Sequence, residues 1–365
     1  MEKQTLINEF VQHKLKIPSN RDEDWLYYDF ESLQYSISQD SNHIQNINEL
    51  FEGNYLYFSN GQLEKKQLNN SIKHMTEISP EKNQNSFIEF AKKSSEKQTL
   101  EFNNLQEKIR LIYNASYGYA STNIEIKSND STIEIERIFL TRKSSIINNY
   151  INLSLTNQSN VCMSEINIEN EGHILDFVEA SLDNNCHFKG LNQSYLCNNS
   201  RFENKVQLNG ETATARLNGL SINGKNKQTF YNTHVFHNVG NNESHQLFKS
   251  INKDGALFEY NGKVSVKKDA QQINSYQLNQ NILLDEYATI HSRPQLFIDA
   301  DDVKCSHGST TGDLNQEELF YLMSRGIDEL TSKKLVLNAF ISDIFQENTF
   351  NKYIKKSHSI LNQII

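Results

Sequence analysis

The chain has 365 residues, of which 37% are hydrophobic and 22% charged, and its formal net charge is −9 at pH 7. This acidic balance gives no reason to expect nucleic acid or an anionic membrane as a partner. Although a mean hydropathy of −0.65 is low for a compact globule, 20 Phe and 16 Tyr argue against a disordered chain. A thin core with a large polar surface, as in a stacked β-solenoid, fits both observations.

The N-terminus carries no sign of a secretory signal, because the apolar residues between Leu6 and Val11 are spaced along one face of a helix. No segment approaches the roughly 18 consecutive apolar residues that cross a bilayer. The four cysteines form no C-x-x-C pair, which favours reduced thiols. We therefore expect a cytoplasmic protein without a membrane anchor.

Residues 1–115 are expected to form an N-terminal, mainly helical domain with polar loops. The stretch "PSNRDEDWLYYDF", residues 18–30, holds the only tryptophan, Trp25, directly behind an acidic run. Such a cluster is typical of a helix or turn that is anchored to a core.

Residues 116–312 are expected to form a β core, because short stretches such as "STIEIERIFL" alternate apolar and polar residues between Asn, Gly and Asp. No proline occurs between Pro80 and Pro294, which fits a continuous hydrogen-bonded ladder. A β-helix, a sandwich and a propeller are all compatible with this pattern. Since we find no propeller signature and no strict hexapeptide repeat, an irregular right-handed parallel β-helix is favoured.

Residues 313–365 return to a helical period and are expected to form a C-terminal helical domain. Asp313 and Gln316 are placed as a capping box, and Gly326 is placed to end the first helix. A second helix is expected from about residue 332, and a third from about 350 to 363. The apolar faces of the first two helices include Leu319, Phe320, Leu322, Met323, Leu335 and Phe340. Helices in this position would cover the last turn of a solenoid and offer a docking surface.

Cys305 and His307 are the strongest candidates for chemistry. On an extended segment, positions i and i+2 point to one face, so a thiolate and an imidazole there can share one metal ion. Two ligands are too few for a stable iron or zinc site, so further ligands would have to come from another chain. On spacing alone, a buried cysteine beside a surface histidine is the better explanation of the pair.

Two other groups of residues have weaker claims. Asp299, Asp301 and Asp302, together with Glu317 and Glu318, could serve a β-helix enzyme that cleaves acidic polysaccharide. Such a site needs a basic cluster that the neighbouring sequence lacks. His234 and His237 lie three positions apart in an expected strand, so they face opposite sides and cannot grip one metal.

Residues 262–327 closely resemble the most characteristic block of the SufB/SufD family of iron–sulfur cluster assembly scaffold proteins, in the form found on its SufD branch. The matching elements are Asp269-Ala270-Gln271, Tyr276-Gln277, Asn279, Asn281, Pro294-Gln295-Leu296, Ala300 to Gly308, Leu319 to Leu322 and Ser324 to Ile327. Residues 18–30 also resemble the N-terminal signature of the family, with Trp25 and Tyr27 in place. Ser309 and His291 depart from the usual residues.

The resemblance implies a scaffold rather than an enzyme. Its β-helix would pair with a SufB-like paralogue, and its C-terminal helices would bind one copy of a SufC-like ABC ATPase. A nascent cluster would be built where the two β-helices meet, with iron or the cluster held transiently by His307 and with Cys305 in a secondary role.

The resemblance implies no tightly bound cofactor, although it allows reduced flavin in the complex and self-pairing of the isolated chain as a homodimer. The alternatives that stay open are a polysaccharide-active β-helix enzyme and a purely structural homodimer.

Overall fold

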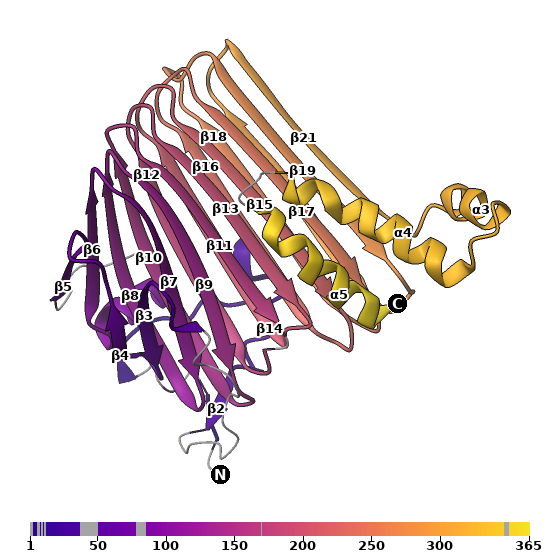
Figure 1. Ribbon diagram of the computed structural model, residues 1–365, viewed down its shortest axis with the longest axis horizontal. Coiled ribbons are helices and arrows are strands. Elements are labelled where there is room, and N and C mark those ends of the chain that lie inside the picture. The colour runs from indigo at the N-terminus through magenta and orange to yellow at the C-terminus, as the bar shows by residue number, and fades with distance from the viewer. Residues whose placement is uncertain are drawn as a thin grey trace.

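A long parallel β-solenoid forms the body of the protein, as seen in the computed structural model (Figure 1). The structure describes residues 3–5, 8, 10, 12–36, 50–77, 85–168, 170–346 and 350–365. From β6 onward the chain alternates between two sheets, so that each turn adds one parallel strand to each sheet. The expected parallel β-helix is thus confirmed as the core of the fold.

The strands divide between these two sheets and one small separate pair. The nine-stranded sheet contains, in spatial order, β20 (Thr289–Ile298), β18 (Leu257–Val266), β16 (Gln228–His237), β14 (Asn199–Leu208), β12 (His173–Leu182), β10 (Ser145–Thr156), β8 (Gly118–Asn129), β6 (Lys97–Asn103) and β5 (Lys73–Glu77). The ten-stranded sheet contains β21 (Val303–Gly312), β19 (Ile273–Leu283), β17 (Glu243–Asn252), β15 (Thr214–Asn223), β13 (His187–Tyr195), β11 (Asn160–Ile168), β9 (Thr132–Thr141), β7 (Gln106–Ala115), β3 (Asn54–Ser59) and β4 (Gln62–Gln67). The separate antiparallel pair is β1 (Lys3–Thr5) with β2 (Gln34–Ser36).

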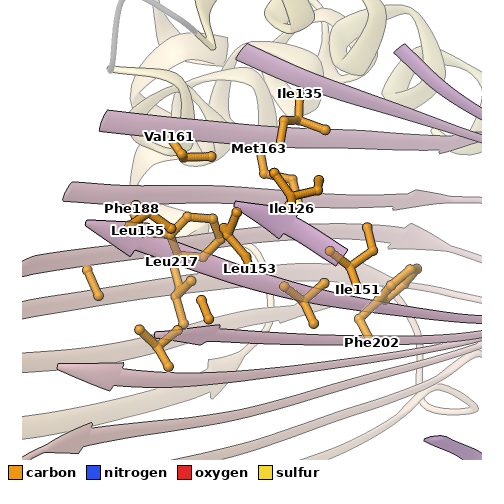
Figure 2. Packing of buried hydrophobic residues seen from close by; sticks show 14 of the residues in the cluster. Ile126, Ile135, Ile151, Leu153, Leu155, Val161, Met163, Phe188, Phe202 and Leu217 are labelled. Atoms are coloured by element: carbon orange, nitrogen blue, oxygen red, sulfur yellow. The ribbon is translucent and has the colours of Figure 1, made fainter. Parts of the chain in front are cut away.

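Alternation along each strand places one set of side chains in the lumen between the sheets (Figure 2). The parallel register then stacks like on like, so that Ile151 of β10 lies between Ile124 of β8 and Val178 of β12. Asparagines such as Asn157 and Asn185 occupy the turns with positive φ, a conformation that Asn tolerates better than most residues. The alternating stretches and the abundant Asn of the sequence therefore have one structural cause.

A buried ionic cluster interrupts the apolar lumen. Arg137 donates to both oxygens of Asp176, at 2.9 and 2.8 Å, and to Glu165 at 2.5 Å. Asn149 donates to Asp176 at 2.6 Å. Burial raises the pKa of Glu165 well above its ordinary value, and the neighbouring Asp176 raises it further, although the Arg137 guanidinium opposes both effects. The cluster therefore places one arginine between two buried acidic side chains.

The solenoid starts earlier than the boundary expected at residue 116. Residues 54–115 hold five strands, β3 to β7, and one helix, α2 (Ser86–Ser94), whereas a mainly helical region was expected there. β3, β6 and β7 pair in parallel with later strands and so belong to the first turns. Parts of the expected helical region, residues 1–2, 6–7, 9, 11, 37–49 and 78–84, lie outside the described residues.

The N-terminal segment lies against the outer face of the nine-stranded sheet. A 3-10 helix, η1 (Glu23–Trp25), places Trp25 over the guanidinium of Arg201, 3.6 Å from the ring centroid. Trp25 and Tyr28 join a second apolar cluster with Phe87 of α2 and Phe230 of β16. The tryptophan stretch is therefore anchored to a core, as its composition predicts.

The C-terminal region is helical, as expected. It contains α3 (Gln316–Ser324), α4 (Glu329–Ser342), η3 (Asp343–Phe345), η4 (Asn351–Tyr353) and α5 (Ile354–Ile364). Gly326, at φ +88°, follows α3 as predicted, but Asn315 caps that helix instead of Asp313, because its side chain accepts from the amides of Glu317 and Glu318. None of the helices in the described ranges is long and apolar enough to cross a membrane.

The helices α4 and α5 fold back over the outer face of the ten-stranded sheet, whereas α3 stands away from it (Figure 1). Leu337 and Ile341 of α4 pack in one cluster with Leu220 and Ile251 of the sheet. Of α3, only Leu319 is buried in this cluster, and the rest of that helix is exposed or partly exposed.

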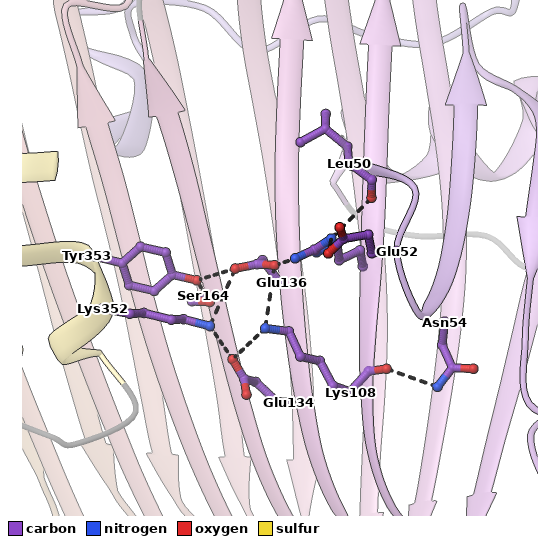
Figure 3. Close-up of polar contacts among 10 residues, drawn as sticks. Leu50, Glu52, Asn54, Lys108, Glu134, Glu136, Ser164, Lys352 and Tyr353 are labelled. Carbon is purple, nitrogen blue, oxygen red and sulfur yellow. Dashed lines mark hydrogen bonds and ion pairs between the residues drawn. The ribbon is translucent and has the colours of Figure 1, made fainter. Parts of the chain in front are cut away.

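A polar network fastens η4 to the same sheet (Figure 3). Lys352 forms an ion pair with Glu134, and Tyr353 donates to Glu136 at 3.0 Å. Although burial opposes its ionisation, the hydrogen bond from Arg110 and the charges of Lys352 and another lysine lower the pKa of Glu136 to about 2. Glu136 therefore stays ionised at neutral pH, and its contacts hold η4 against the sheet.

Candidate functional site

The two ends of the solenoid are built differently. At the N-terminal end the sheets finish in antiparallel strands, β4 and β5, and β4 carries the exposed charges Glu64, Lys65 and Lys66. At the C-terminal end the nine-stranded sheet finishes in β20 and the ten-stranded sheet in β21. Each of these strands has ten residues and pairs in parallel with one neighbour only among the described residues. Charged antiparallel strands discourage further pairing, whereas long regular edges favour it. The C-terminal end is therefore the candidate assembly surface.

Cys305 and His307 both lie on β21, at this open end. Cys305 pairs in register with Ser275 of β19, and His307 pairs with Gln277. Cys305 packs against the lumen cluster, so strand alternation turns His307 toward the lumen as well. The two side chains share a face, as their spacing predicts. His307 is exposed and Cys305 half-buried, because no further turn covers β21.

Cys305 and His307 carry side chains of the types that bind metals, and both lie on the edge strand β21. Burial raises the pKa of the Cys305 thiol, so the thiol stays protonated until a metal displaces its proton. No group of three or more His, Cys, Asp or Glu side chains placed to hold a metal occurs within the described ranges. Two side chains alone are too few for a stable iron or zinc site.

Exposed apolar side chains gather on α3 and at the start of α4. Among the residues expected there, Phe320, Met323 and Leu335 are 72%, 44% and 46% exposed. Leu322 is half-exposed and Leu319 is buried. Two further exposed residues were not predicted, Tyr321 at 59% and Leu330 at 49%. Tyr321 lies within the first predicted helix, whereas Leu330 precedes the second, which was expected to begin at about residue 332.

Phe340 differs from the other residues of this group. Its ring lies 4.4 Å from the Lys249 ammonium, which also donates to the Phe340 carbonyl oxygen at 2.7 Å and to Asp343 at 2.8 Å. Phe340 therefore attaches α4 to the sheet, and the exposed surface lies on α3 and the first turns of α4.

A groove of about 680 Å³ runs beside this exposed surface, between α3, α4 and the loop after β19. Leu284, Leu319, Phe320 and Met323 form its apolar wall. Asp285, Glu286, Glu329 and Lys333 line the rest. An apolar wall beside mostly acidic side chains suits a protein partner with apolar and basic side chains.

The N-terminal segment contacts β20 at the open edge. Arg293 of β20 forms an ion pair with Glu23 at 3.3 Å, and the rings of His291 and Tyr27 stack with centroids 3.6 Å apart. These contacts were not predicted, although the acidic run before Trp25 offered a signal. They tie the edge strand to the body of the protein.

The carboxylates considered for an enzyme do not converge. Asp299, Asp301 and Asp302 lie in the exposed turn before β21, whereas Glu317 and Glu318 lie beyond its far end. Ten residues of strand separate the two groups by about 33 Å. His234 and His237 also stay apart, because the first bonds Ser265 on the outer face and the second bonds Ser244 in the lumen.

Comparison with known proteins connects this architecture to one family. A family model described as "SUF system FeS cluster assembly, SufBD core domain" matches residues 112–340, more than half of the chain. The chain is 38% identical over 144 residues to the iron–sulfur cluster assembly protein SufD of Escherichia coli. The aligned segment covers 40% of this chain and 34% of that protein.

The SufD proteins of two further organisms also match. That of Bacillus subtilis is 30% identical over 146 residues, covering 40% of this chain and 33% of that protein. That of Plasmodium falciparum is 27% identical over 250 residues, covering 65% of this chain and 16% of that protein. The aligned parts thus span about a third or less of these relatives. The resemblance seen in the sequence is confirmed.

Proposed function

Because the chain belongs to the SufB/SufD family, on its SufD branch, we propose that it is a scaffold subunit for iron–sulfur cluster assembly. In this proposal the open end of the solenoid pairs with a SufB-like paralogue, and iron and sulfide are the cargo at the joint. The helices α3 and α4 bind a SufC-like ATPase. The chain supplies surfaces and ligands rather than a catalytic centre of its own.

The observation that carries the proposal is the contrast between the two ends of the solenoid. Only at the C-terminal end does the described part of the chain offer parallel edge strands in both sheets, and Cys305 and His307 lie there. A paralogous solenoid can continue both sheets across such a joint by adding strands to their edges. It would also bring the ligands that the Cys305–His307 pair lacks.

The projecting helix α3 supports the second contact. Phe320 and Tyr321 are large, exposed and far from the lumen, and large exposed apolar groups on a soluble protein mark contact surfaces. Because α3 is anchored through α4 to the solenoid, movement of a bound ATPase can be transmitted to the sheets.

The test is His307→Ala, compared with Ser306→Ala on the same strand but with its side chain on the opposite face. The tagged chain is isolated with its partners under anaerobic conditions and reconstituted with ferrous iron and sulfide. We expect iron affinity to fall by about tenfold or more for His307→Ala, on the scale of losses at metal sites, and to be unchanged for Ser306→Ala. Equal iron affinity of the two variants would contradict the proposed role of His307.

Self-pairing is a second candidate for the same surface, since a second copy presents the same unpaired edges of β20 and β21. The mass of the purified complex separates the two. A homodimer that excludes any paralogue at cellular concentrations would favour the second candidate.

A further inference from the structure

Beneath His307, the lumen contains a column of glutamines. Strand register places Gln246 of β17, Gln277 of β19 and His307 of β21 one above the other. Strands in a sheet lie about 4.8 Å apart, so successive side chains in such a column are within reach of a shared small molecule. Gln277 is thus the last covered residue of the column, directly below the open end.

The side-chain amide of Gln277 lacks a hydrogen-bond partner in the part of the chain that the structure describes. Gln277 is 0% exposed, and neither its Oε1 nor its Nε2 has a hydrogen-bond partner among the described residues. The layer below differs at the oxygen only. The Oε1 of Gln246 accepts from the hydroxyls of Thr233 at 2.5 Å and of Tyr260 at 3.3 Å, whereas its Nε2, like that of Gln277, has no partner among the described residues. The unsatisfied amide therefore lies at the mouth of the lumen, one strand inside the edge.

Another buried amide on the same strand shows that the fold can satisfy such groups. Asn279, also 0% exposed, donates to the carbonyl oxygen of Phe248 at 3.0 Å and to Asn281 at 3.2 Å. Leaving an amide buried without hydrogen bonds lowers stability, and such a group in a native protein calls for an explanation. An explanation is that the partner of Gln277 arrives only when the site is loaded.

We infer that Gln277 is a further residue of the site at the joint. From inside the lumen, its Nε2–H donates to the small ligand that accompanies iron at His307, which is water or sulfide. This inference rests on the proposed function. A neutral amide adds no charge to the site, so it can orient this ligand and still allow the cargo to leave. Hydrogen bonds of this kind orient metal ligands and tune iron–sulfur centres.

The test compares Gln277→Leu, which removes the amide at similar volume, with Asn279→Leu as the matched control. In the isolated full-length chain, removing an unsatisfied group should raise the melting temperature of Gln277→Leu by about 1–2 °C. Removing a satisfied group should lower that of Asn279→Leu. If Gln277→Leu does not fold, Gln277→Met, which keeps an unbranched stem, carries the same readouts.

The second readout is iron affinity of the anaerobically purified complex, with ferrous iron alone in one arm and with ferrous iron plus sulfide in the other. We expect about a tenfold loss for Gln277→Leu in at least one arm. A loss with iron alone identifies water as the ligand, and a loss confined to the second arm identifies sulfide.

A higher melting temperature together with weaker iron binding supports the inference, because a purely structural glutamine would not give both. A lower melting temperature, or unchanged iron affinity in both arms, overturns it. His307→Ala is measured in parallel. If His307→Ala binds iron normally, the proposed function fails; if only Gln277→Leu binds normally, the inference alone fails.

Discussion

Replacement of Phe320 by alanine tests the docking surface on α3. Phe320 is 72% exposed in this chain. For a phenylalanine of roughly 200 Å², that fraction is about 140 Å² of apolar surface, which is about 3.5 kcal/mol at about 25 cal/mol per Å² if a partner covers it fully. Ordering of the interface offsets part of this gain, so we expect a loss of about 2 kcal/mol, or about thirtyfold in the dissociation constant.

The assay is a calorimetric titration of the purified chain with the ATPase, which gives the dissociation constant. A separate calorimetric titration measures binding of the paralogue. Phe297→Ala is the matched control, because Phe297 is 52% exposed on the edge strand β20. We expect Phe320→Ala to weaken ATPase binding alone and Phe297→Ala to weaken pairing with the paralogue alone. Equal ATPase affinity of Phe320→Ala and the unaltered chain would refute the assignment of α3.

Three further predictions concern the body of the solenoid. Arg137→Met leaves Glu165 and Asp176 in the lumen without their cation, so the free energy of unfolding should fall by about 3–5 kcal/mol in chemical denaturation. Since burial raises the pKa of Glu165, the folded chain keeps a proton that the unfolded chain releases above pH 4.5, and stability should fall as pH rises from there by at most about 1.4 kcal/mol per unit. Glu165→Gln should flatten that dependence, and a profile unchanged by this substitution would contradict the reasoning. Trp25→Ala removes the stack on Arg201 that holds η1 in place, and with it the support of the Glu23–Arg293 ion pair on β20. Amide hydrogen exchange should therefore become faster in β20 and stay unchanged in β11.

The solenoid core could be predicted because its sequence pattern repeats with the geometry. In β9, "TIEIERIFLT", buried and partly exposed residues alternate as the period of two requires. The C-terminal helices were predictable from their helical period, but the buried face of α4 was not. Leu337 and Ile341, which the predicted apolar faces did not include, are buried against the sheet, whereas Leu335 is 46% exposed.

The first turns could not be predicted in the same way. In β3, "NYLYFS", apolar residues follow one another without alternation, because both faces are covered: Leu56 and Phe58 join the lumen cluster, and Tyr57 packs against Phe51. Continuous apolar runs do not distinguish a strand from a buried helix. The position of Gln277 beneath His307 was also beyond the sequence, because strand register is set by long-range pairing.

The measurement that tests the central claim most directly is the composition of the native complex. The tagged chain is purified from its own cell without oxygen, and the proteins that accompany it are identified and weighed by mass spectrometry. The account predicts that a paralogous β-helix protein and a small ABC-type ATPase accompany the chain. Recovery of the chain alone, or paired only with itself, would contradict the scaffold function while leaving the solenoid fold intact.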